Sequence, residues 1–541
     1  MRKLEKTGNY LILPTSETDE YGYVKLILKA GDTVLDTAYT RLCPPEKAEY
    51  ALFLHTKCFA ERGLHDLTLE IKEADSEWSV PAEKGLTEEK ITAYEGYPYY
   101  ADTVDAYREP LRPYVHFTSM RGWINDTNAP AYYDGTYHLY YQYEPGTLQP
   151  VWDNSQWGHA HSEDLYHWVE DVPVFRWPNA PSGSSFLRRE TGNLCVCCQD
   201  RIYESHDGGY TFDHLCDNPT SGGDPKTFWD EEHGQYVCIS LKSGSAYQIS
   251  VSPDLLHWEL TSVLEGYHEC PDFFRLPLDG TGVKKWILVG GDLAYNIGSF
   301  DGRTFVPDPV DPERADIFVP VRENSREMRE LCDRYNGVTV NEGYTDWRRF
   351  FAYAYQSFTN LPDGRIVRIG WLAEDYHWYG MPFNQCQSIP QDVTLRTTRY
   401  GERLCMMPSP EISNVYRGDP VSVGAGEERT FSDCPAADIT IRFAPDAEIT
   451  VGPLCFDYLP ERGTLRIRMR DMPDFRIPYP LLEDETEITA RVILDRCCAE
   501  LFFGIGECYV PLRLVPSGDV IPVKCGVGAS ASVQPLGMMF E

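Results

Sequence analysis

Asp126 is the residue of this chain whose sequence neighbours most strongly suggest a catalytic carboxylate. It follows Trp123, an isoleucine and Asn125 within the segment His116–Pro130, HFTSMRGWINDTNAP. A tryptophan can stack on a sugar ring, an amide can hold its hydroxyl groups, and a carboxylate can attack an anomeric carbon. Asp126 and Asn128 would equally suit a turn, because both side chain types bond to nearby backbone. The spacing alone leaves both interpretations open.

The part of the chain that must position such an acid contains a repeated sequence motif. In the middle of the chain Ser-x-Asp occurs four times, at intervals of 43, 47 and 47 residues, beginning at Ser162, Ser205, Ser252 and Ser299. Short apolar runs lie between the copies, and a period in the forties with several short strands per unit is typical of propeller blades. With a fifth unit at 350–398, the pattern predicts a five-bladed β-propeller over residues 108–405.

The segment around Asp126 resembles the N-terminal signature of glycoside hydrolase family 32, the β-fructosidases that include invertases, inulinases and levanases. That signature is typically Trp-Met-Asn-Asp-Pro-Asn-Gly, and four of its positions match. The matching residues are Trp123, Asn125, Asp126 and Asn128. Other matching strings are Tyr140–Tyr143, Trp157–Ala160 and Glu269–Asp272. The resemblance runs from about residue 107 to the end of the chain and implies the propeller and a C-terminal β-sandwich.

The resemblance also implies a role for each of three acids. Asp126 would be the nucleophile on the fructose anomeric carbon, and Glu269 would be the general acid/base. Asp224 matches the aspartate of the family's Arg-Asp-Pro motif, which holds ring hydroxyls and grips more strongly at the transition state. Because the first strands of blades line a central channel, these acids are expected to converge at one end of it.

Further residues are predicted to contact the substrate, most of them because they match family positions, and His268 as a candidate replacement for a missing family residue. They are Trp123, Asn125, Gln142, Trp157, Ser184, His268 and Asp346. For Gln142 and Trp157, packing inside the propeller is the alternative interpretation, and Trp371 is expected to pack between blades.

Two departures from the family pattern bear on the substrate. Gly223 stands where the family has the arginine of Arg-Asp-Pro, so a bidentate donor to sugar hydroxyls is missing there. His268 stands where the family usually has tryptophan. His268 or Arg348 is a candidate to replace the lost arginine.

Two modules are expected to flank the propeller, which makes the whole chain all-β. Alternating strands within residues 1–100 predict a small N-terminal β-sandwich-like module, which is also a candidate surface for a homo-oligomer. Residues 76–107 are polar and acidic and predict a linker with one short helix. Alternation returns in residues 410–541, the expected C-terminal β-sandwich. Residues 325–335 predict a helix between the fourth and fifth blades.

Composition limits the classes of partner. A formal charge of −34 over 541 residues disfavours nucleic acid and anionic lipid as partners. No apolar run is long enough to span a bilayer, and a signal peptide is not expected. The 17 scattered cysteines then favour reduced thiols and a cytoplasmic location. Cys195, Cys197 and Cys198 lack a second set of ligands, so neither metal nor cofactor is expected.

The leading hypothesis is a retaining hydrolase that releases terminal β-fructofuranosyl units from sucrose, fructo-oligosaccharides or fructans. A fructosyltransferase on the same scaffold is an alternative, because acceptor choice depends on the shape of the pocket. A non-catalytic fructan-binding protein is suggested by Gly223, but all three acids are present. A glycosidase of arabinose-type furanosides fits the Trp-x-Asn-Asp and Glu-Cys-Pro-Asp strings less well.

Overall fold

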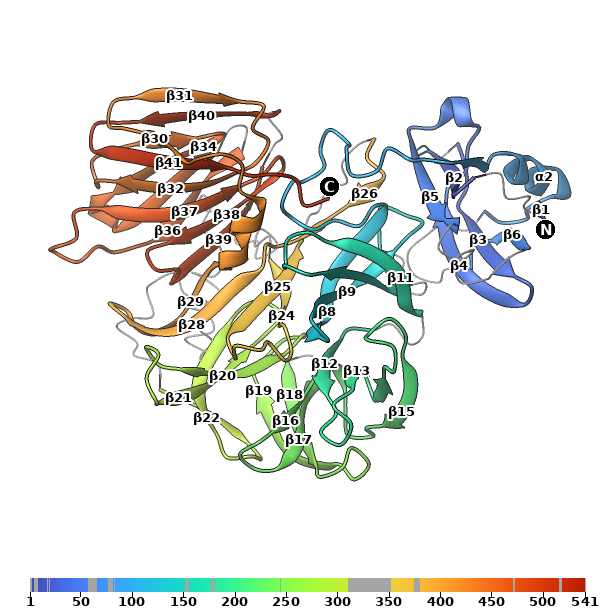
Figure 1. Cartoon of the computed structure of the whole chain (residues 1–541), viewed down its shortest axis with the longest axis horizontal. Coiled ribbons are helices and arrows are strands. Elements are labelled where there is room, and N and C mark those ends of the chain that lie inside the picture. Colours follow the sequence, from blue (N-terminus) through green and yellow to red (C-terminus); the bar gives the residue numbers. More distant parts are fainter. Residues whose placement is uncertain are drawn as a thin grey trace.

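The computed structural model describes residues 2–3, 8–16, 18, 20–56, 66–75, 81, 83–150, 155–176, 181–243, 245–309, 352–373, 380–469, 472–514 and 518–540. Its elements are almost all strands, as the all-β prediction requires. Figure 1 shows the N-terminal strands in blue on one side, the orange and red C-terminal strands on the other, and the remaining sheets between and below them. The predicted helix at residues 325–335 lies outside the described residues.

Five antiparallel sheets of four consecutive main strands occupy residues 122–408. The first sheet holds β8 (Gly122–Tyr133), β9 (Thr136–Glu144), β10 (Gln156–Ser162) and β11 (Val169–Arg176). The second holds β12 (Gly183–Leu187), β13 (Leu194–Cys198), β14 (Arg201–Glu204) and β15 (Asp213–Asp217). The third holds β16 (Gly223–Asp230), β17 (Gln235–Ser243), β18 (Ala246–Ser252) and β19 (Glu259–Glu265).

The fourth and fifth sheets continue the pattern. The fourth holds β20 (Asp272–Pro277), β21 (Lys284–Val289), β22 (Tyr295–Phe300) and β23 (Phe305–Pro307). The fifth holds β24 (Tyr353–Ser357), β25 (Ile366–Leu372), β28 (Gln391–Thr398) and β29 (Gly401–Pro408). Two short strands join the fifth sheet to the first: β26 (Phe383–Asn384) runs parallel to β8, and β27 (Cys386–Gln387) pairs with β25. β29 continues three residues past the expected boundary at 405.

The Ser-x-Asp repeat has a structural role. Each copy lies at the turn between the third and fourth strands of a sheet. Its aspartate accepts two backbone N–H groups of that turn, as in Asp164 with Tyr166 and His167, and Asp301 with Arg303 and Thr304. The repeat therefore marks one turn in each of the first four sheets and none of the candidate catalytic groups.

The C-terminal module consists of two six-stranded antiparallel sheets with a shared apolar core. One sheet holds β30 (Val421–Val423), β41 (Ala529–Pro535), β32 (Ala437–Phe443), β37 (Ile488–Leu494), β38 (Cys498–Phe503) and β39 (Cys508–Arg513). The other holds β31 (Glu428–Ser432), β40 (Val520–Cys525), β33 (Ile449–Val451), β34 (Leu454–Leu459), β35 (Thr464–Met469) and β36 (Met472–Pro478). Short 3₁₀ turns lie at η5 (Pro410–Val415) and η6 (Pro460–Arg462).

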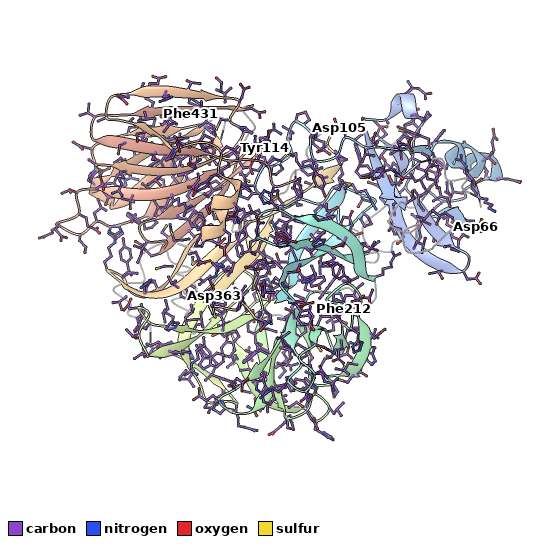
Figure 2. All side chains as sticks on the ribbon, viewed as in Figure 1. Asp66, Asp105, Tyr114, Phe212, Asp363 and Phe431 are labelled. Carbon is purple, nitrogen blue, oxygen red and sulfur yellow. The ribbon has the colours of Figure 1, made fainter. Side chains whose placement is uncertain are left out.

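A buried histidine joins this module to the five sheets. His116 Nδ1 lies 2.8 Å from Asp495 Oδ2, and its Nε2 lies 3.0 Å from Glu500 Oε1. Burial opposes a charge on the ring, but the two carboxylates outweigh it and raise the pKa of His116 to about 10. Asp495 also accepts the backbone N–H of Tyr114, which lies at this junction in Figure 2.

The N-terminal strands form two small sheets around one apolar core. Four strands make one sheet: β1 (Arg2–Lys3), β6 (Leu67–Glu73), β3 (Val24–Ala30) and β4 (Thr33–Thr40). Three make the other: β5 (Tyr50–His55), β2 (Tyr10–Thr15) and β7 (Tyr99–Ala101). A 3₁₀ turn, η1, spans Pro45–Lys47.

The segment expected to be a linker belongs partly to this module. Its short helix is present as α2 (Glu88–Gly96), where the Thr87 side chain caps the N–H of Lys90. Tyr94 of α2 is buried in the module's core, and β7 pairs with β2, so the module runs past the expected boundary at 100. The linker interpretation is corrected for these residues.

The cysteines carry no disulfide, and the helices no membrane span, in the part of the chain that the structure describes. Within the described residues every cysteine is a free thiol, and Cys195, Cys197 and Cys198 are buried on β13. Of the helices that the structure describes, none has the length and apolar character needed to cross a membrane.

Candidate active site

The candidate catalytic residues lie where the first strands of the sheets are distorted. β8 bulges between Ile124 and Thr127, so that Asn125 and Asp126 both lie opposite Gln142. β16 has a register shift just after Gly223, where Asp224 adopts a left-handed φ of 48°. β24 is shifted just after Tyr353. Bulges re-aim side chains, and strain of this kind concentrates at functional sites.

Asp126 is held in a buried polar chain. Its Oδ2 accepts a hydrogen bond of 2.9 Å from the hydroxyl of Ser182, which in turn accepts one of 2.7 Å from Nε2 of Gln142. Its Oδ1 lies 3.3 Å from Nδ2 of Asn125. The donors fix the orientation of the carboxylate while leaving it next to the other acids.

Cys270 brings two carboxylates together. Its Sγ lies 3.6 Å from Asp126 Oδ2 and 3.8 Å from Asp224 Oδ2, and its backbone N–H donates to Asp224 Oδ2 over 3.2 Å. Cys270 has a left-handed φ of 44°, as does Glu269 with a φ of 31°. Residues more than 140 positions apart thus meet at one small site.

Glu269 is anchored through both its backbone and its side chain. Tyr247 donates from its hydroxyl to the carbonyl oxygen of Glu269 over 2.6 Å. Tyr353 donates to Glu269 Oε2, also over 2.6 Å. Burial above all, followed by Cys270 and Glu269, raises the pKa of Tyr353 far above its ordinary value, so this hydroxyl keeps its proton. About 45% of the Glu269 side chain is exposed, which leaves it accessible to a substrate.

The carboxylates repel one another. Burial, and next the charge of Asp224, raise the pKa of Asp126 to about 7, while the Ser182 hydrogen bond opposes the rise. Burial also raises the pKa of Asp224, with Glu269 adding to the effect. In the described part of the chain, no lysine or arginine pairs with any of the three acids.

The predicted substrate contacts fall into two groups. Trp123 and Asn125 lie beside Asp126 on β8, and His268 Nε2 lies 3.7 Å from Glu269 Oε2. Trp157 is wholly buried, and its Nε1 donates to Pro181. Ser184 is buried as well, and its hydroxyl accepts the N–H of Thr227.

Trp157 and Ser184 therefore lie behind the site, whereas Gln142 reaches Asp126 through Ser182. Asp346 and Arg348 lie outside the described residues.

Three residues of the site were not predicted. Tyr353 carries the hydrogen bond to Glu269, and Ser182, rather than Ser184, bonds Asp126. Gln387 of β27 donates to the carbonyl of Asn125 and accepts from the hydroxyl of Thr127, which braces the bulge in β8. Ser182 stands two residues before Ser184, a predicted contact, which is a partial signal, but neither Tyr353 nor Gln387 stands in a recognisable motif.

Trp371 was expected to pack between blades. Its ring lies edge-on to Trp123 at 6.0 Å and to Tyr353 at 6.3 Å. These three rings, called the aromatic wall below, border the acids. Within the described residues no cluster of histidine, cysteine and acidic side chains could hold a metal ion.

Comparison with known proteins decides the family. The model of the glycosyl hydrolases family 32 N-terminal domain matches residues 116–185 and 210–408, which include all three acids. The chain belongs to glycosyl hydrolase family 32.

This family 32 chain is similar to curated enzymes. It is 30% identical over 368 residues to levanase of Bacillus subtilis (strain 168), covering 58% of this chain but half of the levanase. It is 26% identical over 522 residues to the extracellular exo-inulinase inuE of Aspergillus niger, covering 77% of this chain and 92% of the inulinase.

Solved structures share the fold. The exo-inulinase from Aspergillus awamori has a TM-score of 0.63 at 20% identity, with 80% of this chain and 100% of that chain covered. The fructofuranosidase from Schwanniomyces occidentalis complexed with fructose has a TM-score of 0.64, with the same identity and coverage.

The raised pKa of Asp126 predicts an acid limb in the activity profile. A carboxyl group attacks carbon only when ionised, so kcat/KM should fall about tenfold per pH unit below pH 7. Ser182→Ala removes a hydrogen bond that favours the ionised form, so its limb should move to higher pH. The check is to measure kcat/KM against pH for the wild type and Ser182→Ala. If the acid limb lies at the same pH in both proteins, it does not report the ionisation of Asp126.

Proposed function

We propose that this protein is a retaining glycoside hydrolase that releases terminal β-fructofuranosyl units from sucrose, fructo-oligosaccharides or fructans. The observation that carries the proposal is that Asp126, Asp224 and Glu269 meet around Cys270. Tyr353 donates a hydrogen bond to Glu269, the most exposed of the three acids. The names of the relatives, levanase and exo-inulinase, support the substrate class.

The chemistry follows from the placement of the groups. Asp126 attacks the anomeric carbon of fructose while Glu269 gives its proton to the departing oxygen, so the glycosidic bond breaks and a fructosyl ester forms on Asp126. Glu269 then takes a proton from water, whose oxygen attacks the same carbon and releases Asp126. Two displacements keep the starting configuration.

Asp224 has no acid–base step in this scheme. Its backbone partner, the N–H of Cys270, fixes one carboxylate oxygen, and the carboxylate accepts hydrogen bonds from ring hydroxyls. These bonds strengthen as positive charge develops on the ring. Trp123, Asn125, Gln142 and His268 complete the proposed binding set, with Asp346 as a further member from the sequence.

The same proposal covers the architecture. The five sheets of residues 122–408 are proposed as the blades of a propeller, whose first strands bring the acids to one end. Strand pairing between β26 and β8, which joins the last sheet to the first, supports this closure. Residues 1–100 and 410–541 are the proposed flanking modules, extended as described above.

Product analysis tests the function directly. The full chain is incubated with sucrose, inulin, levan and arabinan, and free and oligomeric sugars are separated. Release of fructose supports hydrolysis, longer fructosyl products would instead favour the transferase, and arabinose release would overturn the substrate class. No product from any of them would favour a binding protein without activity.

Gly223 offers a test of substrate choice. A Cβ at this position would meet only Leu241 at an ordinary 3.6 Å, so a side chain can start at residue 223 without moving the backbone, and Gly223→Arg is a practical variant. The new guanidinium should add a charge-assisted bond to a ring hydroxyl and raise kcat/KM for sucrose about tenfold. Kinetics on a panel of fructosides checks this, and a uniform loss would show that the natural substrate occupies the space of the arginine.

Gly222 supplies the matched control. A Cβ there would lie 1.9 Å from the carbonyl oxygen of Leu241, so Gly222→Ala should damage the fold, whereas Gly223→Arg should not. Equal melting temperatures of wild type and Gly223→Arg are required before the kinetics are compared.

Tyr353→Phe should lower kcat about tenfold with little change in KM. The phenyl ring keeps the packing against Trp371 but cannot donate to Glu269. In a Glu269→Gln background the same change should cost nothing further, because the two residues act as one unit. Multiplicative losses in the double variant would separate Tyr353 from the acid.

A further inference from the structure

The N-terminal module, residues 2–101 as described, is attached at the end of the first sheet that carries the candidate site. Trp123 of β8 pairs with Glu144 at the end of β9, and Gln156 at the start of β10 pairs with Tyr143 and Arg176. The start of β8 and the ends of β9 and β11 therefore lie together. Figure 1 shows β4 and β5 of the module on this side of the first sheet.

Polar contacts fix the module to this end. Asp36 of β4 forms an ion pair with Arg121, with Nη2 and Oδ2 3.1 Å apart, and accepts from Nε2 of Gln156 over 3.3 Å. Arg176 donates to the carbonyl of Leu35. Asp36 and Arg121 are both largely buried, so these bonds are formed away from water.

An apolar anchor accompanies them. Leu148, in the loop after β9, is buried within the core of the N-terminal module rather than in the first sheet. Gly146 of the same loop approaches so closely that a Cβ there would lie 2.3 Å from the Cβ of Ala38. The loop thus enters the module and is held by it.

A hydrogen-bonded path leads from this anchor to the aromatic wall. Nδ2 of Asn384 donates to the carbonyl oxygen of Leu148 over 2.8 Å. The next residue, Gln385, has a left-handed φ of 73°, and its Oε1 accepts from Nε1 of Trp371 over 3.1 Å. Trp371 lies against Tyr353, which donates to Glu269. The two hydrogen bonds that begin the path are short, and Leu148, Asn384 and Gln385 are buried.

We propose that the N-terminal module is a working part of the active site, in which Leu148 and Asn384 are positioning residues for the aromatic wall and, through Tyr353, for Glu269. The inference rests on the proposed function, since it gives Glu269 its role. The family model begins at residue 116, so the module lies outside the matched domain. Burial of Leu148 in the module fixes the carbonyl that accepts from the Asn384 amide. Gln385 accepts from the Trp371 indole and so fixes that ring. The aromatic wall then keeps the Tyr353 hydroxyl within hydrogen-bond distance of Glu269.

Two leucines of the same core separate positioning from stability. Leu148→Ala and Leu69→Ala each delete a buried side chain from the N-terminal core, and Leu69 lies on β6, away from the loop. Both should lower the melting temperature of the module to a similar degree. At a temperature well below melting, Leu148→Ala should lower kcat on sucrose about tenfold, and Leu69→Ala less than about twofold.

A second pair of variants tests the path itself. Asn384→Asp removes the donor to the Leu148 carbonyl and should reproduce the loss in kcat. Leu148→Met conserves the volume of the side chain, so this variant should keep most of the wild-type kcat. The loss should appear in kcat, because the path ends at Tyr353 and Glu269, whereas a change in KM would report on Trp123, which pairs with Asn384 and is a proposed sugar contact. Equal kinetics for Leu148→Ala and Leu69→Ala would overturn the proposal.

Amide exchange provides a readout independent of activity. Leu148→Ala should speed deuterium exchange in β25–β27, residues 366–372 and 383–387, and Leu69→Ala should leave it unchanged. Unchanged exchange in both variants would overturn the positioning role. A wild type inactive on every fructoside would defeat the proposed function, while the exchange data would still decide the mechanical link.

Discussion

Asp126→Asn is expected to retain less than about one per cent of the wild-type kcat on sucrose. The amide has nearly the same size but is a very poor nucleophile, and loss of a nucleophile costs several powers of ten. The side chain lies within hydrogen-bond distance of Ser182 and close to Cys270, so the variant should keep the local packing. Steady-state rates with a concentration series of sucrose check the prediction, and retention of more than one per cent would remove Asp126 from the nucleophile's role.

A melting series shows that the variant is folded. Because the pKa of Asp126 is raised to about 7, the folded protein holds a proton there between about pH 4 and 7 that the unfolded chain releases. The contribution of Asp126 to the stability of the wild type therefore falls as pH rises through this range, whereas asparagine does not titrate. Asp126→Asn should melt higher than wild type at pH 8 and no higher at pH 4. A lower melting temperature at pH 8 would mean that the lost activity reflects damage to the fold.

Much of the architecture could be predicted because it depends on local pattern. Alternating apolar positions give strands, and the Ser-x-Asp copies recur because each turn needs an acceptor for two backbone N–H groups. The three acids stand next to short motifs, so Asp126, Asp224 and Glu269 could be named from the sequence. Their meeting at Cys270 follows from the order of the sheets.

The supporting residues could not be predicted, for physical reasons. Tyr353 and Gln387 act across sheets, and nothing in their own neighbourhood distinguishes them from the chain's many other tyrosines and polar strand residues. The bulges that aim Asp126 and Asp224 depend on pairing with β9 and β17. Trp157 matched a motif yet lies fully buried, because a motif residue can be retained for packing.

The module boundaries show the same limit. Residues 76–107 have the composition of a linker, but Tyr94 and β7 are held by partners far away in sequence. Amino-acid composition indicates how strongly a segment favours burial. It does not indicate which surface of the folded protein the segment will pack against. Leu148 is the reverse case, a loop residue buried in another module's core.

Glu269→Gln is expected to lower kcat on sucrose by about a thousandfold, within the range for loss of a general acid. Glutamine can still accept the hydrogen bond from Tyr353, so the loop should keep its conformation. The glucose oxygen of sucrose is a poor leaving group and needs the proton that glutamine cannot give. An aryl fructoside with an acidic phenol needs little protonation, so bond cleavage in that substrate should fall much less.

The comparison of the two substrates is what assigns the role. Single-turnover rates on each isolate bond cleavage from the later attack of water, in which Glu269 also takes part as a base. A ratio of losses well above ten between sucrose and the aryl fructoside identifies the proton donor, whereas equal losses would count against it. Adding azide, a nucleophile that needs no base, should restore the second step for the aryl substrate and give a fructosyl azide of retained configuration. Such a product requires the ester on Asp126, and rescue by azide in Glu269→Gln but not in the wild type identifies Glu269 as the base that activates water.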